Sequence, residues 1–527
     1  MAQTTAEDHA PPSGRGDRFV TNVLWGWLGV GVNIFIGLVI QRYIVRKLGA
    51  ERYGIWILVF SILDYLWFFD LGLNTAVTNF CARYLATREP QKINEVINTA
   101  LFYFFLLGLG LIGFTTLVSG HVAGFFQVSP AYRQEFLTLV MLTGLSWGLC
   151  IILHMFLSAL DGFQRFDLTS RVQVLTLLLR STGYAVSLAL GYGLIAMGIV
   201  FVATQMLSYV LNFWNFRRVF TELRFSAALV KFSMFRQILR YGVRSFVASA
   251  AGLLQNQGSA ILIGHFLPTA FVGFFSLPQR LLQYAFEAVS RIGMVTRSSA
   301  AEMHASGRRE DVIKLGIYSN RYSFTLFMPL VLALLVYGRE LIGLWIGAEF
   351  AAHSAPLLPI MALSTAVALA GQFNSSAILF GLGEHGGYAR SVLIEAVLNV
   401  SAMIVVIPRY GILGAAWVSA GLMLLNRGLY TPWLVCRALD FGFVEYMRSI
   451  YLRPMLIGLP VLALAYAAKL YGLGGATWLE LIAGSGCIAL VYMVLAFYTC
   501  IERSHRGLFV SRIPFLTPAL RDALNRA

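Results

Sequence analysis

Charged residues are scarce in this chain. Only 12% of its 527 residues are Asp, Glu, Lys or Arg, whereas 58% are hydrophobic, and the mean hydropathy is +0.71. Soluble domains carry about 25% charged residues. So low a charge content excludes a soluble enzyme or a string of soluble domains, and we expect a polytopic membrane protein.

Cysteines are few and widely scattered. The five of them form no C-x-x-C motif and have no neighbouring histidine pair: Cys81, Cys150, Cys436, Cys487 and Cys500. An odd number of cysteines in or beside apolar segments indicates small buried side chains rather than disulfides or metal ligands. We therefore expect no metal site.

The motifs of nucleotide hydrolysis and of common catalytic sites are missing. The chain contains no G-x-x-x-x-G-K-[ST], no H-E-x-x-H and no G-x-S-x-G. The polar segments between its apolar runs are too short for a folded catalytic domain. We predict that the protein is not an enzyme and has no cofactor. The energy for its work would come from an ion gradient or from removal of a transported product.

Long apolar runs recur along the whole chain. About 20 apolar residues cross the roughly 30 Å of bilayer hydrocarbon as a helix. Runs of that length lie at about 19–41, 54–78, 97–119, 136–160, 171–191, 194–216, 237–264, 270–294, 312–337, 355–380, 387–408, 412–435, 451–471 and 478–500. We predict an all-α membrane protein with about 14 transmembrane helices.

Three short landmarks recur about 219 residues apart. They are Leu48–Gly54 with Leu267–Gly273, Gly162 with Gly381, and, one residue off that register, Gly191–Leu194 with Arg409–Ile412. A repeated separation predicts two tandem copies of one six-helix unit. Because six is an even number, both copies enter the membrane in the same direction and form parallel repeats.

These copies divide the chain into two lobes and several smaller segments. We expect a disordered cytoplasmic tail at 1–18, an N-lobe at 19–218, a basic cytoplasmic connector at 219–236, a C-lobe at 237–435, two further helices at 436–500 and a cytoplasmic tail at 501–527. The first apolar run is too long for a signal peptide and lacks a small-x-small cleavage site, so it is counted as a helix.

Lysine and arginine gather on one side of the predicted membrane. The connectors on the side of the N-terminus carry most of them, which places both termini in the cytoplasm. This basic surface is ordinary membrane electrostatics, so we expect contact with membrane lipids and none with nucleic acid. One exception is the first outer loop, where Arg42, Arg46, Lys47 and Arg52 form either a functional cation cluster or a set of helix-end anchors.

One predicted helix carries a polar stripe. Arg280, Tyr284, Glu287 and Arg291 are spaced four, three and four residues apart, which places them on one helix face. Ion pairs along the helix are one explanation. Because two arginines against one glutamate leave a surplus positive charge, we favour a stripe that faces an aqueous lumen.

Polar residues at membrane depth recur in both copies. We expect substrate contacts from Arg42, Arg180, Arg280, Arg291, Arg321, Arg427, Asn74 and Asn399, and ion coupling by Asp70, Glu287 or Glu395. For each residue taken alone, an interhelical hydrogen bond is an equally good explanation. The arginine surplus predicts an anionic substrate, since guanidinium matches phosphate oxygens through paired hydrogen bonds.

Three segments resemble a known family. Arg46–Trp56, followed by Asp70–Asn74, and the late turn Ile407–Ala416 are similar to O-antigen and exopolysaccharide flippases. These flippases belong to the polysaccharide branch of the multidrug/oligosaccharidyl-lipid/polysaccharide exporter superfamily. The resemblance covers the first twelve predicted helices and implies two six-helix lobes in a V shape with alternating access.

The same resemblance implies a cargo and partners. The cargo would be an undecaprenyl-pyrophosphate-linked oligosaccharide, moved across the bacterial inner membrane for O-antigen, capsule or exopolysaccharide synthesis. The polymerase and chain-length machinery of the same pathway would be its protein partners. The resemblance transfers no particular binding residue to this chain.

Other functions stay open at this point. An ion-coupled multidrug antiporter shares the superfamily architecture but needs an acidic cavity, and the first predicted helix has no Asp or Glu. A peptidoglycan lipid-precursor flippase is a nearer relative, though the short motifs fit the polysaccharide branch better. A membrane-embedded glycosyltransferase or polysaccharide ligase would need a large outer loop, and the longest ones, about 120–135 and 338–354, are short.

Overall fold

The structure is a computed structural model that describes the backbone of residues 14–471 and 474–506. Within this range, the side chains of 14–33, 67, 244–245, 247–256, 285, 287–295 and 370–372 lie outside the description. The described part contains helices and turns and no strand, so the predicted all-α class is confirmed. The predicted tails at 1–18 and 501–527 fall largely on residues outside the description.

The first copy begins with a long bent helix and ends before a short connector. Its elements are α1 (Gly14–Leu66), η1 (Trp67–Asp70), α2 (Leu73–Ala86), α3 (Pro90–Phe125), η2 (Pro130–Tyr132), α4 (Arg133–Gly162), α5 (Phe166–Ala189) and α6 (Gly193–Val219). The short η3 (Ala227–Leu229) lies in the connector.

The second copy follows with three long helices and several broken ones. Its elements are α7 (Phe232–Phe266), α8 (Thr269–Ala305), α9 (Arg309–Trp345), α10 (Ala348–Ser354), α11 (Leu357–Leu369), η4 (Ala370–Ser375), α12 (Ser376–Leu382), α13 (Gly386–Met423), η5 (Leu424–Tyr430) and α14 (Thr431–Ala438). Both η4 and η5 are π-helical. Two further helices, α15 (Phe443–Leu470) and α16 (Trp478–Thr499), close the described chain.

Two of the predicted breaks between helices are sharp kinks at glycine. Gly49 has φ 76° inside α1, and Gly411 has φ 59° inside α13; both values favour glycine because it lacks Cβ. In the described residues, ten helical stretches are long and apolar enough to cross a membrane, and two of these contain the kinks. The predicted count of 14 spans stays a prediction.

Equivalent glycines make equivalent contacts in the two copies. A Cβ on Gly162 would lie 2.5 Å from the carbonyl oxygen of Thr78, and one on Gly381 would lie 3.0 Å from the carbonyl oxygen of Arg297. Thr78 and Arg297 are 219 residues apart, which is the separation of the two glycines. The tandem repeat predicted from the sequence is therefore also a repeat of packing.

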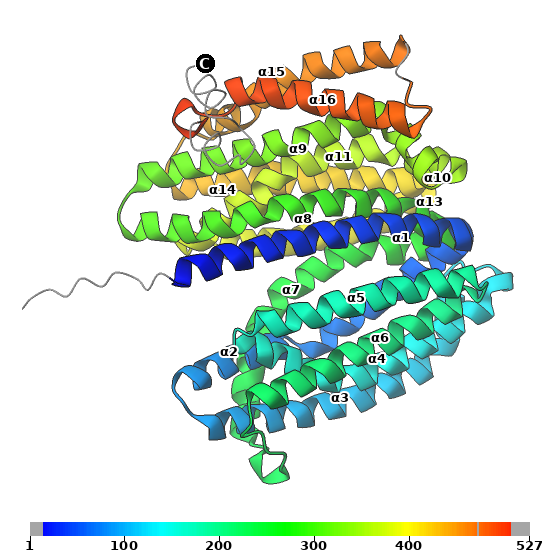
Figure 1. The fold of residues 1–527 in the computed structure, drawn as a ribbon, viewed down its shortest axis with the longest axis vertical. Coiled ribbons are helices and arrows are strands. Elements are labelled where there is room, and N and C mark those ends of the chain that lie inside the picture. The colour runs from blue at the N-terminus through cyan, green and yellow to red at the C-terminus, as the bar shows by residue number, and fades with distance from the viewer. Residues whose placement is uncertain (1–13, 472–473, 507–527) are drawn as a thin grey trace, which may run out of the picture.

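The helices form two bundles that share α1 and α7 (Figure 1). The helices α2 to α6 lie together in one bundle, and α8 to α16 lie in the other. In the figure α1 runs along α8, and α7 crosses between the bundles, where it packs on α2 and α3 as well as α13. The last two helices pack on α9, on the side of the second bundle away from α7.

Candidate functional site

A polar link joins the two copies where α1 meets α7. Gln257 of α7 donates from Nε2 to Oδ2 of Asp64 in α1 at 2.6 Å. Ser61 of α1 donates to Oε1 of the same glutamine at 2.9 Å. The nitrogen and the oxygen of the Gln257 side-chain amide, in the second copy, are thus both bound by residues of the first copy. This link was not predicted, since no sequence spacing relates residues 193 positions apart.

Arg280 lies at the same junction. Its guanidinium carbon lies 6.0 Å from the centre of the Tyr284 ring, and its charge acts on Asp64 and on Tyr53, both in α1. The hydroxyl of Tyr284 fills the space beside Gly37 of α1. Arg280 is therefore a cation on α8 that faces the first copy, and its side chain is exposed.

The predicted polar stripe on α8 contains two further charged residues, Glu287 and Arg291. Glu287 and Arg291 lie within α8, but their side chains fall outside the described residues. Their assignment to the lumen stays a prediction.

Arg180 lies inside the first copy, between α5 and α6. It donates from Nε to Oγ1 of Thr204 at 3.1 Å and from Nη2 to Oε1 of Gln205 at 2.8 Å. Its guanidinium also lies 4.8 Å from the ring centre of Phe201. All three partners are neutral, so its charge is solvated by dipoles and a π face rather than neutralised.

Asp70 and Asn74 connect the segment after α1 to α4 through hydrogen bonds. Asn74 donates from Nδ2 to Oδ1 of Asp70 at 2.8 Å, and Ser158 of α4 donates to Oδ1 of Asn74 at 3.0 Å. Asp70 and Asn74 are buried. The two residues belong to different elements, Asp70 to the end of η1 and Asn74 to α2, because Leu71 (φ 49°) and Gly72 (φ 73°) break the helix between them. The contact with Ser158 depends on the packing of α4.

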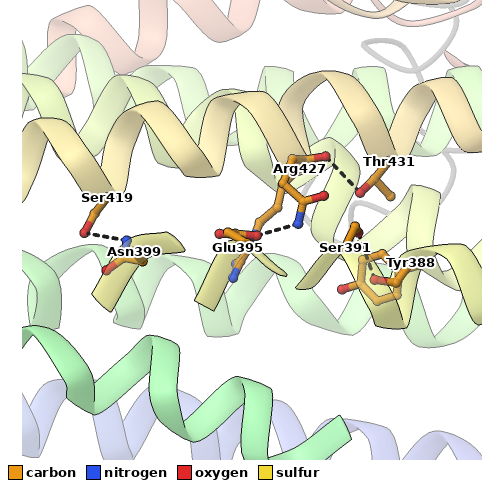
Figure 2. A network of polar contacts seen from close by, with 8 residues as sticks. Tyr388, Ser391, Glu395, Asn399, Ser419, Arg427 and Thr431 are labelled. Atoms are coloured by element: carbon orange, nitrogen blue, oxygen red, sulfur yellow. Dashed lines mark hydrogen bonds and ion pairs between the residues drawn. The ribbon is translucent and has the colours of Figure 1, made fainter. Parts of the chain in front are cut away.

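The second copy contains a buried ion pair (Figure 2). Nε of Arg427 in η5 lies 3.3 Å from Oε1 of Glu395 in α13. Asn426 donates to Oε2 of the same carboxylate at 2.6 Å. One turn along α13, Asn399 donates to Oγ of Ser419 at 3.3 Å. Because η5 is π-helical, Asn426 and Arg427, which are adjacent in the sequence, both reach one carboxylate.

The cations predicted for the first outer loop lie within α1, on both sides of its kink at Gly49, and are bound by the protein in separate places. Arg42 lies over the ring of Trp478 at 5.5 Å, and Lys47 lies over the ring of Tyr43 at 5.9 Å. Arg46 donates to the carbonyl oxygens of Leu344 and Ile346, at 3.1 Å each. Arg52 forms a paired contact with Glu135 at 2.7 and 3.0 Å. These side chains support helix ends, and the structure does not gather them into one cluster.

Arg321 lies between α9 and α15. Its Nε donates to the carbonyl oxygen of Ser449 at 2.6 Å. Of the residues expected to contact substrate, the structure therefore places Arg280 at the junction of the copies. Arg180, Arg321 and Arg427 lie within one bundle or the other.

Comparison with known proteins identifies the family. Residues 19–297 match the family described as Polysaccharide biosynthesis protein. A Haloferax volcanii protein named "Probable low-salt glycan biosynthesis flippase Agl15" is 23% identical over 79% of this chain and 82% of its own length. A Shigella flexneri protein provisionally named an O-antigen transporter is 18% identical over 79% of this chain and 98% of its own length.

Solved structures share the fold. The lipid II flippase MurJ, in an inward closed conformation, superposes with a TM-score of 0.71 at 12% identity, over 91% of this chain and 99% of that chain. An inward-facing multidrug resistance MATE family transporter of the MOP superfamily gives a TM-score of 0.63 at 14% identity, over 77% of this chain and 95% of that chain. The fold and the family match agree, and the chain belongs to the polysaccharide biosynthesis protein family as a multi-pass membrane protein.

Proposed function

We propose that the protein is a flippase for an undecaprenyl-pyrophosphate-linked oligosaccharide repeat unit, moved across the bacterial inner membrane for O-antigen, capsule or exopolysaccharide synthesis. The observation that carries the proposal is the meeting of two equivalent copies at Asp64, Gln257 and Arg280 in a chain of this family. The names of its relatives, a glycan biosynthesis flippase and an O-antigen transporter, support the same class of cargo.

The proposed mechanism is alternating access between an N-lobe at 19–218 and a C-lobe at 237–435. The connector at 219–236 and both tails lie in the cytoplasm, and the helices at 436–500 belong to the C-lobe side. Opening one side of the junction separates α1 from α7 and α8. The link between Asp64 and Gln257 is then broken and re-formed in each cycle.

The proposed role of Arg280 is to bind the pyrophosphate. A guanidinium donates paired hydrogen bonds to phosphate oxygens, and the exposed Arg280 side chain at the junction has the charge for it. Arg291 is the second proposed contact on α8. The oligosaccharide would occupy the aqueous lumen, and the polyprenyl tail would stay in the bilayer.

Ion coupling remains assigned to Asp70, Glu287 or Glu395. Glu395 is the carboxylate best placed to exchange partners, because it is held by a cation and an amide on η5. Protonation would release Arg427 and remodel η5. Transport into vesicles under a proton or a sodium gradient, with Glu395→Gln as the variant, tests this role; equal dependence on the gradient in both proteins would contradict it.

The deciding experiment is the extraction of lipid-linked oligosaccharides from a deletion strain. We expect complete repeat units to accumulate on the cytoplasmic leaflet and surface polymer to be lost. The double variant Arg280→Gln/Arg291→Gln should reproduce this phenotype, while Arg218→Gln, an exposed arginine at the end of α6, should restore export.

Two results would contradict the proposal. Unchanged lipid-linked pools together with altered drug sensitivity would indicate a multidrug antiporter. Normal polymer export by the double variant would remove the proposed pyrophosphate contacts and leave the flippase assignment itself intact.

A further inference from the structure

A second cationic site lies between α9, α15 and the end of α16, away from the junction of the copies. Its centre is Arg321, which is only 6% exposed. Nε is bound to the carbonyl oxygen of Ser449. Within the described part of the chain, the two terminal nitrogens of Arg321 donate to no protein acceptor. A guanidinium whose terminal donors are left without a protein acceptor can bind an anion through paired hydrogen bonds.

A second arginine adds to the charge of this site. Arg453 of α15 donates from Nη1 to the carbonyl oxygen of Thr499 at 3.4 Å, and its charge acts on Arg321. The acidic residue that acts on Arg321 is Glu502. Arg506 follows, bound to the carbonyl oxygens of Ile501 and Tyr498 at 3.2 and 2.5 Å. Among the described residues named here, three arginines stand against one glutamate, which gives a surplus positive charge.

Polar aromatic side chains form one wall of the site. Arg321 lies 5.8 Å from the ring centre of Tyr318, which stacks on Tyr322 at 6.0 Å. The hydroxyl of Tyr322 lies 2.8 Å from Nδ1 of His505. The Tyr322 hydroxyl also accepts from the backbone nitrogen of Glu502 at 3.3 Å, so it holds the chain after α16 beside the arginines.

The depth of the site follows from the length of α16. A helix of 22 residues is about 33 Å long, which just spans a hydrocarbon core of roughly 30 Å. Thr499, the last residue of α16, therefore marks the hydrocarbon boundary. Arg453 contacts its carbonyl oxygen, so the arginines lie at the level of the lipid headgroups.

Apolar side chains flank the same site on the outer surface of α15 and α16. Leu452, Leu456, Val494 and Leu495 are all exposed. A cationic site at headgroup level beside an exposed apolar surface matches an amphiphile with a phosphate at one end and acyl chains at the other.

We propose that this site binds the phosphate of an anionic membrane phospholipid such as phosphatidylglycerol, with its acyl chains along α15 and α16. Arg321 and Arg453 bind the phosphate oxygens, and the hydroxyl of Tyr322 lines the site. The lipid joins the two C-terminal helices to α9. This inference does not rest on the flippase proposal, because the site lies on the far side of α9 from α1 and α7 (Figure 1).

The test uses the purified full chain in detergent, titrated with phosphatidylglycerol or phosphatidylcholine. Bound lipid is counted by native mass spectrometry, and the unfolding temperature is measured alongside. We expect phosphatidylglycerol to bind and to raise the unfolding temperature more than phosphatidylcholine. Arg321→Gln/Arg453→Gln should weaken this binding by about tenfold or more, the effect of losing charge-assisted hydrogen bonds. Arg218→Gln is the matched control and should bind like the unaltered protein.

The remaining outcomes distinguish which phosphate-bearing molecule the site binds. Equal binding of phosphatidylglycerol by the double variant would overturn the proposal. Binding of inorganic phosphate or undecaprenyl diphosphate at this site in preference to phosphatidylglycerol would overturn it as well, and would assign an anion or carrier-lipid site instead. If the Arg321→Gln variant does not yield monodisperse protein, phosphatidylglycerol binding by the single variant Arg453→Gln decides the question, because Arg453 is exposed.

Discussion

Gly54 of the first copy and Gly273 of the second pack against each other where α1 meets α8. A Cβ on Gly273 would lie 3.4 Å from the backbone nitrogen of Gly54 and 2.9 Å from Cδ1 of Tyr53. A Cβ on Gly54 would overlap the carbonyl oxygen of Thr269. The two glycines that mark the repeat in the sequence therefore allow a close approach between its copies.

The first prediction concerns this contact. Gly54→Ala should destabilise the protein by about 1–3 kcal/mol, because the added methyl forces two helix backbones apart. Gly113→Ala in α3 is the control, since nothing lies within 4 Å of its added Cβ. Thermal unfolding of the purified proteins in detergent gives the comparison. An unfolding temperature of Gly54→Ala equal to that of the unaltered protein would contradict the close packing.

The second prediction compares the equivalent glycines of the two copies. Gly162→Ala should cost more stability than Gly381→Ala, because its Cβ would lie 2.5 Å from a backbone oxygen and that of Gly381 would lie 3.0 Å from one. We expect about 1–3 kcal/mol for the former and less for the latter. The same unfolding assay measures both, and the reverse order would show that the copies relax differently.

The third prediction concerns the buried pair Glu395 and Arg427. Arg427→Met should destabilise by about 3–5 kcal/mol, because it leaves a buried carboxylate without its cation. The double variant Glu395→Gln/Arg427→Met should recover most of that loss, since the neutral amide can still accept from Asn426. A double-mutant cycle on the unfolding free energies reports the coupling. Additive effects would mean that the pair is not coupled.

The fourth prediction concerns the contact between α1 and the end of α9. Arg46 donates to two carbonyl oxygens there, which have no partner within the helix. Arg46→Ala should increase opening of the α1–α8 contact severalfold, since hydrogen bonds to charged groups contribute about 1.5–3 kcal/mol and exposure reduces that value. Lys47→Ala is the control.

The rate of maleimide labelling at Thr269→Cys reports this opening, because Thr269 is buried between α1 and α8. The native cysteines are replaced first, since Cys487 is exposed. Equal labelling rates in Arg46→Ala and Lys47→Ala would show that Arg46 does not hold the contact closed.

The fifth prediction concerns the link between the copies. Asp64→Asn keeps an oxygen acceptor for Gln257, whereas Asp64→Leu removes it. Surface polymer in a complemented deletion strain should be closer to normal with Asn than with Leu. Equal export by the two variants, at equal amounts of membrane protein, would exclude a role for this hydrogen bond in transport.

The sequence by itself determined the helices and the repeat. Both depend on local properties: the length of apolar runs sets where a helix can span, and glycine permits the positive φ that ends one helix and begins another. Gly193 and Gly411, paired in the sequence, indeed have φ values of 71° and 59°. Helix periodicity does not account for the hydrogen bond between Asp70 and Asn74, because they lie on either side of a break between η1 and α2.

Only the tertiary structure decided which side chains meet. Periodicity gives the direction of a side chain on its own helix and contains nothing about the helix that lies beside it. Arg427 was expected in a lumen and binds Glu395, Arg52 of α1 binds Glu135, and Asp64 binds Gln257 of the other copy. These partners lie 32 to 193 residues apart, and long-range packing of the helices selects each of them.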